Sequence, residues 1–267
     1  MTSLSLILSF IFGAIAGSFL NVVSLRFNTG VGLGGRSKCM SCGTKLTWKE
    51  LVPIFSFLFQ KGSCRACKSK ISWQYPLVEF VAGAIFVLIF FVFPPYDVVS
   101  AVRTLLHVVA ACLLLVIAVY DMKHKIIPDQ FAYTFAAIAL LTLFVGGTSW
   151  WHVPGYWALI AGPLLAIPFA FLWLISRGRW MGFGDAKLML GLGWLVGVAA
   201  GINAIILAFW IAAVISVIWL FVTYKKFKSK TEVPFGPYLI LGTYLVLIFK
   251  LQVFDVHMLK DVILSLF

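Results

Sequence analysis

The chain has 267 residues, of which 62% are apolar and only 11% are charged, and it carries a formal net charge of +12. Soluble globular proteins are about half apolar and about a quarter charged. The composition therefore excludes an ordinary soluble domain and indicates an integral membrane protein. The positive charge gives no reason to expect nucleic-acid binding, because most of it lies in a few loops between apolar segments.

Apolar stretches that approach the roughly 17 to 25 residues needed to cross a bilayer recur along the whole chain. We expect about eight spanning helices, over residues 4–25, 76–93, 101–120, 131–146, 156–176, 188–200, 202–223 and 238–254. The sixth is short, and one long kinked helix over 188–223 is the alternative, but two crossings fit the length and the charges better. The predicted fold is an all-α polytopic membrane bundle.

Small residues in the first predicted helix indicate how that helix packs. The stretch GAIAG, residues 13–17, places two glycines four residues apart. This spacing lets a second membrane helix approach closely. The segment has no basic region before it and no small-residue cleavage site after it, so we expect it to be retained rather than removed as a signal peptide.

Lysine and arginine predict the orientation, because loops that are rich in them stay in the cytoplasm. If the N-terminus is outside and eight helices cross, the inner loops contain 18 of the 21 Lys and Arg residues, in the stretches 26–70, 123–125, 177–187 and 225–230. This arrangement also favours contact with anionic membrane lipid.

The one sizeable soluble stretch, residues 26–75, contains four of the five cysteines. They form two CxxC pairs, separated by 21 residues, at Cys39, Cys42, Cys64 and Cys67. Four thiolates at such spacing are typical of a closed structural zinc site with no open position for catalysis. The reducing side of the membrane argues against disulfides. We expect three parts: a first helix over 1–25, a cytoplasmic zinc-binding loop domain over 26–75 and a transmembrane domain over 76–267.

Two further features of this part of the chain have structural interpretations. The apolar stretch 51–62 is too short to span a bilayer, so we expect it to lie on the membrane surface or against the helices. The fifth cysteine, Cys112, lies inside a predicted helix, where we expect it to serve packing.

Carboxylates are scarce in this chain, which has only nine. Asp121 ends the third predicted helix and Asp185 begins the sixth, so opposite chain directions place both at the same depth near the inner face. Asp129 follows Asp121 closely, and Glu79 starts the second helix near the same face. Carboxylates within membrane helices are candidate functional groups by default.

A pair of carboxylates that pack together can perform aspartyl protease chemistry, because one takes a proton from water while the other, protonated, polarises the scissile carbonyl. In the sequence GFGD, Gly182 and Gly184 are expected to let a substrate backbone approach Asp185. The residues alone leave two alternatives open. The aspartates can be stabilising residues at helix ends, or they can relay protons or ions in a transporter.

The ordered set of motifs resembles the type IV prepilin peptidases, the prepilin leader peptidase/N-methyltransferase family. The motifs are GSFLNVV (17–23), the two CxxC pairs, YPLVE (75–79), DMKHKIIPD (121–129), GFGDAKL (182–188) and PFGPYL (234–239). Each is weak alone, but their order along nearly the whole chain is specific.

The resemblance implies a GxGD-type aspartyl protease of the cytoplasmic (inner) membrane, whose transmembrane peptidase domain is the predicted part 76–267. Such enzymes cut the short basic leader from type IV prepilins or type II secretion pseudopilins at the cytoplasmic face. Carried over, the catalytic residues are Asp121 and Asp185. The supporting residues are Asp129, Gly182, Gly184, Lys187 and Glu79.

Many members of the family also methylate the new N-terminal residue with S-adenosylmethionine, and those members have the cysteine-bearing loop. The resemblance therefore implies a zinc ion and this methyl donor as cofactors, but no residue here is assigned to binding the donor. Two other classes remain alternatives: a proton-coupled transporter, and a non-catalytic zinc-bearing assembly factor for a pilus or secretion machine. The sequence indicates no oligomeric state.

Overall fold

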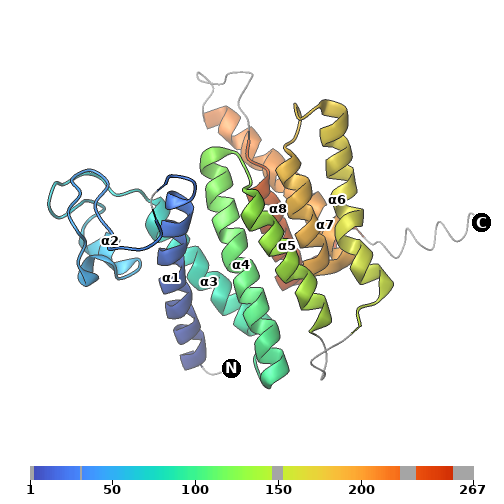
Figure 1. Ribbon diagram of the computed structural model, residues 1–267, viewed down its shortest axis with the longest axis horizontal. Coiled ribbons are helices and arrows are strands. Elements are labelled where there is room, and N and C mark those ends of the chain that lie inside the picture. Colours follow the sequence, from blue (N-terminus) through green and yellow to red (C-terminus); the bar gives the residue numbers. More distant parts are fainter. Residues whose placement is uncertain (1–2, 31, 146–152, 223–232, 255–267) are drawn as a thin grey trace, which may run out of the picture. The chain divides into compact units, whose positions relative to one another are not determined.

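The computed structural model describes residues 3–30, 32–145, 153–222 and 233–254. Regular structure in these residues is helical, with two isolated β-bridges in the soluble loop (Figure 1). The elements are α1 (Ser3–Arg26), η1 (Trp48–Glu50), α2 (Phe55–Phe59), α3 (Gln74–Val92), α4 (Val98–His124), α5 (Asp129–Phe144), α6 (Tyr156–Ser176), α7 (Phe183–Val222) and α8 (Gly236–Phe249). The chain forms two compact units, Met1–Val116 and Ile117–Phe267.

The predicted all-α membrane bundle is confirmed. Within the described residues, α1, α3, α4, α6 and α7 are long and apolar enough to cross a membrane, and α5 and α8 are shorter apolar helices. Each of the eight predicted segments falls on one of these helices. The ends of two segments, Gly146 and Thr223, and the basic stretch 225–230 lie outside the described residues. The three-part domain division remains a prediction, since it depends on the side of the membrane.

Two of the predicted segments lie in one element, α7, whose helical backbone is interrupted at Gly197. There φ is 80° and ψ is 176°, a conformation that is essentially restricted to glycine. The boundary between the segments is thus at Gly197 and not at Gly201, where the sequence suggested it. Gly201 instead allows close helix packing, because it is buried against the side chain of Leu165 in α6.

In the first unit, α1 packs against α3 through the predicted small residues. A Cβ at Gly13 would lie 2.7 Å from the carbonyl oxygen of Ala82, and a Cβ at Gly17 would lie 2.7 Å from the Ala82 Cβ. Apolar burial drives little association inside a bilayer, so close contact of small residues is a main source of helix packing. The packing prediction for GAIAG is confirmed.

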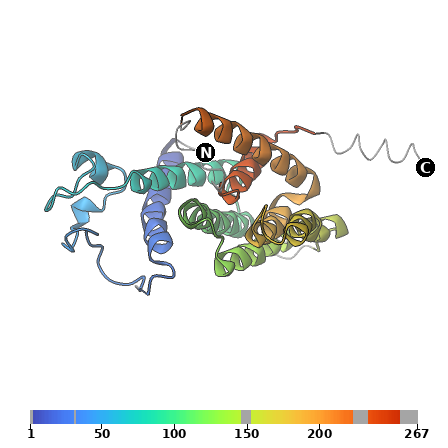
Figure 2. The same ribbon diagram turned by 90° about the horizontal axis from the view of Figure 1, so that it is seen from above.

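In the second unit, α7 packs against α5, α6 and α8 (Figure 2). Its glycines make the close contacts: Gly191 faces Phe135 of α5, and Gly193 faces Ala161 and Gly162 of α6. The end of α4 and the starts of α5, α7 and α8 meet at one end of this unit (Figure 1). The candidate functional site lies at these helix ends.

Candidate functional site

Asp121 lies in the last turn of α4 and is only 4% exposed. Its Oδ2 accepts a hydrogen bond of 3.2 Å from the backbone N–H of Gly236, the first residue of α8. The carboxylate therefore faces the positive end of a helix dipole. A Cβ at position 236 would lie 2.7 Å from the same oxygen, so this close approach requires glycine.

Asp185 lies in the first turn of α7 and is 8% exposed. Its carboxyl group interacts electrostatically with that of Asp121. Among the described residues, neither carboxylate forms an ion pair. The structure therefore brings together the two aspartates that the sequence analysis paired, in a buried site where no described residue supplies a neutralising cation.

The side chain of Ile127, in the turn between α4 and α5, packs between the two helix starts that carry the site. A Cβ at Gly184 would lie 2.9 Å from the Ile127 Cβ, and a Cβ at Gly236 would lie 3.2 Å from its Cδ1. The room that the sequence analysis expected beside Gly184 is therefore filled by the protein itself. Gly182 differs: of the atoms in the described part of the chain, a Cβ there would approach Gly184 N and Asp185 Oδ2 at 3.9 and 4.0 Å and nothing closer.

Asp129 and Lys187 form an ion pair at 2.6 Å between the start of α5 and the first turn of α7. The ammonium group of Lys187 also lies 5.0 Å from the ring centroid of Phe183 and 5.4 Å from that of Tyr133. The Lys187 side chain is 14% exposed and that of Asp129 is 62% exposed. Two of the predicted supporting residues thus bind one another and join α5 to α7.

Glu79 lies in the first unit, early in α3, and is 6% exposed. Its carboxylate accepts a hydrogen bond of 2.7 Å from the backbone N–H of Ile54 in the soluble loop. Ile54 has a φ of 63°, which is a strained value for a β-branched residue. Glu79 therefore attaches the loop to α3 at a strained position.

The short helix α2 follows this attachment point and presents two kinds of surface. Phe57 is buried, and its ring lies 4.7 Å from that of Trp73. Phe55, Leu58 and Phe59 are exposed. One face of the predicted apolar stretch 51–62 thus packs within the loop, while the other remains exposed.

The four paired cysteines form one cluster in the first unit. The Sγ atoms of Cys39, Cys42, Cys64 and Cys67 all lie within 4.8 Å of one another. The Sγ atoms of Cys39 and Cys67 are 3.9 Å apart. Sulfurs bound tetrahedrally to zinc at about 2.3 Å lie roughly 3.8 Å from one another. The spacing of the thiols therefore fits a tetrahedral metal site.

The two cysteine pairs lie on two similar turns. In each turn the residue after the second cysteine is left-handed, with φ of 72° at Gly43 and 61° at Lys68, and its N–H donates to the carbonyl of the first cysteine at 2.9 Å. Hydrogen bonds from the backbone of Cys42 and Ser41 lower the pKa of the Cys39 thiol to about 6. This shift favours the thiolate, which is the form that binds metal.

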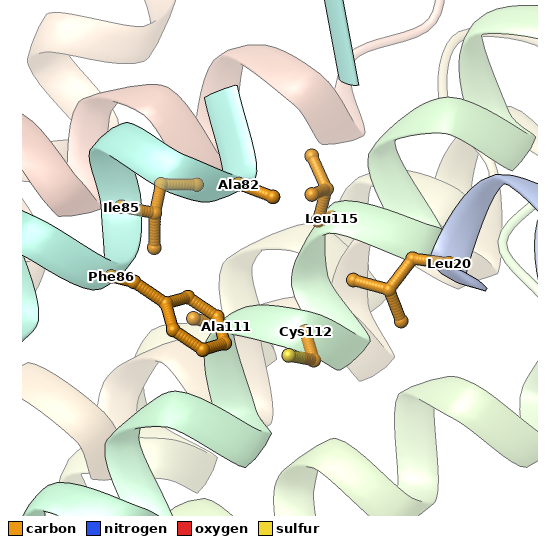
Figure 3. Close-up of a pocket in the computed structure, with 7 residues that line it drawn as sticks. All are labelled: Leu20, Ala82, Ile85, Phe86, Ala111, Cys112 and Leu115. Atoms are coloured by element: carbon orange, nitrogen blue, oxygen red, sulfur yellow. The ribbon is translucent and has the colours of Figure 1, made fainter. Parts of the chain in front are cut away.

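Cys112 lies apart from this cluster, in α4. Figure 3 shows it beside an apolar crevice lined by Leu20, Ala82, Ile85, Phe86, Ala111 and Leu115, from α1, α3 and α4. The crevice has no room for water. This environment agrees with the packing role expected for Cys112.

Comparisons with known proteins identify the family. The chain matches the Bacterial Peptidase A24 N-terminal domain over residues 11–93 and the Type IV leader peptidase family over residues 108–217. The prepilin leader peptidase/N-methyltransferase of Xanthomonas campestris pv. campestris is 30% identical over 211 residues, which are 76% of this chain and 69% of that relative. The chain belongs to the type IV leader peptidase family.

Relatives with the same name occur in other bacteria. The one from Aeromonas salmonicida strain A449 is 31% identical over 80% of this chain and 71% of its own length. The one from Bacillus subtilis strain 168 is 29% identical over 88% of this chain and 91% of its own length. No solved structure matches the chain.

Two residues that lie beside the carboxylate pair, Gly236 and Ile127, were given no role in the sequence analysis. Gly236 is part of the motif PFGPYL, and Ile127 is part of DMKHKIIPD. A glycine followed by proline at a helix start was the available signal for Gly236. It did not reveal the partner, because Asp121 is 115 residues away along the chain.

Proposed function

We propose that this chain removes the leader peptide from type IV prepilins or pseudopilins, with Asp121 and Asp185 as its catalytic pair, and N-methylates the new N-terminal residue. The relatives are named for both activities. The observation that carries the peptidase assignment is the meeting of two buried carboxyl groups between the ends of α4 and α7. Family membership does not support the transporter and assembly-factor alternatives.

The proposed hydrolysis uses one ionised and one protonated carboxyl group. Two buried carboxyl groups that repel one another share a proton. The ionised group takes a proton from a bridging water, whose oxygen attacks the scissile carbonyl carbon, while the protonated group donates its proton to the carbonyl oxygen. The tetrahedral intermediate then breaks its C–N bond, and the carboxyl group that took the proton from water passes it to the leaving nitrogen. The products are the leader's new carboxylate and the pilin's new amino group.

Neighbouring residues support this pair in the proposal. The N–H of Gly236 orients the Asp121 carboxylate. The Asp129–Lys187 ion pair joins the start of α5 to the turn of α7 that carries Asp185. Small displacements of reacting groups lower rates strongly, so these contacts matter for the geometry of the pair.

We infer that Cys39, Cys42, Cys64 and Cys67 hold one structural zinc ion. The spacing of the thiols supports this assignment. Four protein ligands leave no open coordination position, so the metal supplies folding free energy and not catalysis. The loop of about fifty residues has too few buried residues to be stable without such a constraint.

The implied methyl donor is S-adenosylmethionine. The crevice beside Cys112 is apolar and has no room for water. A second cavity, an open groove lined by residues of α5, α6 and α7 that include Lys187, is lined almost entirely by apolar atoms. Neither fits a ligand that carries a ribose and an amino-acid group, because such ligands need convergent polar contacts. We therefore assign no donor-binding residue and derive no step of the methyl transfer.

We infer that the protein spans the cytoplasmic membrane with its N-terminus outside and the carboxylate pair near the cytoplasmic face. The Lys and Arg residues before α3, after α4 and between α6 and α7 support this orientation. The soluble cysteine-bearing loop lies on the same side in this arrangement.

The peptidase assignment is tested by co-expressing a prepilin with the wild-type chain, Asp121→Asn or Asp185→Asn and measuring the pilin by mass spectrometry. We expect wild type to release a leader-free pilin that carries the added mass of one methyl group. Each substitution should lower the cleavage rate on the order of 10⁴-fold, because removing one member of a catalytic unit costs nearly as much activity as removing all of them.

Asp97→Asn is the matched control, because Asp97 is exposed at the start of α4 and asparagine also caps helices well. This variant should cleave like wild type. Persistent cleavage in either of the other two variants would show that the catalytic pair is assigned wrongly.

A further inference from the structure

The short helix α2 of the cysteine-bearing loop has one apolar face that is exposed. Phe55, Leu58 and Phe59 are each more than half exposed, while Phe57 of the same helix is buried. Phe55 precedes the other two by three and four residues, so the three side chains are neighbours on the helix surface. Clustered apolar side chains of this kind mark a surface that meets lipid or another protein. We call these three side chains the α2 face.

The attachment of α2 to α3 sets the depth of the α2 face. The carboxylate of Glu79 accepts a hydrogen bond of 2.7 Å from the N–H of Ile54, the residue directly before α2. Glu79 follows Gln74, the first residue of α3, by five positions, or about 8 Å along the helix axis. Helix α2 therefore begins beside the first two turns of α3 and not beyond its end.

The same turns of α3 carry side chains that face lipid. Trp73, Leu77 and Phe80 are each more than half exposed, and their spacing of four and three residues places them on one face. Because α3 is a candidate membrane span, this face meets the bilayer. Tryptophan at the start of a span is typical of the membrane interface. The ring of Phe57 packs against Trp73, so α2 lies next to the interfacial end of this face.

The chain on both sides of α2 is strongly basic. The one acidic residue within 49–70 is Glu50, whose carboxylate accepts a hydrogen bond from the N–H of Thr47 in its own turn. The basic residues within this stretch are all exposed, namely Lys49, Lys61, Arg65, Lys68 and Lys70. Basic residues near a bilayer attract anionic lipid headgroups. The charge next to the α2 face thus complements an anionic lipid surface.

We propose that the α2 face inserts into the boundary between headgroups and acyl chains in the leaflet where α3 begins, and that the basic residues beside it bind anionic phospholipid there. Amphipathic helices bury their apolar face about 5–10 Å deep at this boundary. The first two turns of α3 lie at that depth, because its 19 residues are just long enough for a hydrocarbon core of about 30 Å. This docking holds the cysteine-bearing loop against the bilayer. It depends neither on the peptidase assignment nor on which leaflet is cytoplasmic.

The first test is photocrosslinking of the full chain in nanodiscs of phosphatidylcholine and phosphatidylglycerol. Benzoylphenylalanine at position 59 should give phospholipid adducts in mass spectra, as should position 80 on the lipid-facing side of α3. The matched control is position 40, because Met40 is 88% exposed but lies between two cysteines of the cluster. It should give far fewer adducts. Crosslinks from position 59 to protein alone, or adducts no more frequent than at position 40, would overturn the proposal.

The second test measures how fast subtilisin cuts the cysteine-bearing loop in the same nanodiscs. Phe59→Ser should raise the cleavage rate by about tenfold, because one aromatic side chain no longer holds the loop in the bilayer. Lys61→Gln should raise it about fivefold, which corresponds to roughly 1 kcal/mol for one basic residue at an anionic surface. The effect of Lys61→Gln should vanish in nanodiscs of phosphatidylcholine alone.

Met40→Ser is the control for the protease experiment, since it removes an equally exposed apolar side chain outside the α2 face. Its loop should be cut at the wild-type rate. The metal content of all three variants should equal that of wild type, which separates undocking of the loop from its unfolding. A wild-type cleavage rate in Phe59→Ser would contradict insertion of the α2 face, and a Lys61→Gln effect that persists without phosphatidylglycerol would contradict the binding of anionic lipid.

Discussion

Gly236 lies against the carboxylate that it binds, so at the scale of single residues it is the sharpest probe of the site. Gly236→Ala would place a Cβ 2.7 Å from Oδ2 of Asp121, and the carboxylate or α8 must shift. Since a displacement of about 1 Å can lower a catalysed rate by about 100-fold, we expect prepilin cleavage to fall by roughly 10- to 100-fold. Initial cleavage rates of the purified variant measure this effect.

The residue-scale control is Gly155→Ala, at the position before α6. A Cβ there meets no atom of the described residues within 4 Å, so its cleavage rate should match wild type. Thermal unfolding in detergent should show both variants folded. A fully active Gly236→Ala chain would contradict the proposed role of Asp121.

At the scale of elements, the two cysteine turns depend on a common metal. Metal analysis of the purified chain should find one zinc per molecule. Cys39→Ser or Cys64→Ser should lose it, because three thiolates bind zinc far more weakly than four. The loop should then become sensitive to protease, since metal binding supplies its folding free energy.

Cys112→Ala provides the element-scale comparison, because Cys112 lies in the apolar crevice away from the cluster. It should retain a full equivalent of zinc. Zinc that stays bound after both cluster substitutions would exclude the four-cysteine site.

At the scale of the whole molecule, the charge distribution predicts which loops face the cytoplasm. Tyr96, between α3 and α4, and Trp180, between α6 and α7, are both exposed. In intact spheroplasts, a membrane-impermeant maleimide should label Tyr96→Cys but not Trp180→Cys. Permeabilised cells should label both, and the unsubstituted chain gives the background. Labelling of Trp180→Cys alone would reverse the orientation and move the carboxylate pair to the outer face.

The sequence by itself determined the helical membrane class, the cysteine cluster and the two aspartates to be paired. These follow from local properties, namely the length of apolar runs, the spacing of thiols and the cost of carboxylates near hydrocarbon.

Only the tertiary structure decided which helix ends meet. It showed that Gly236 binds Asp121, that Ile127 fills the space beside Gly184, and that α7 is interrupted at Gly197. These contacts join residues far apart in the chain, and they depend on which small-residue faces pack together. Many apolar helices offer such faces, so the choice among them is a property of the whole fold.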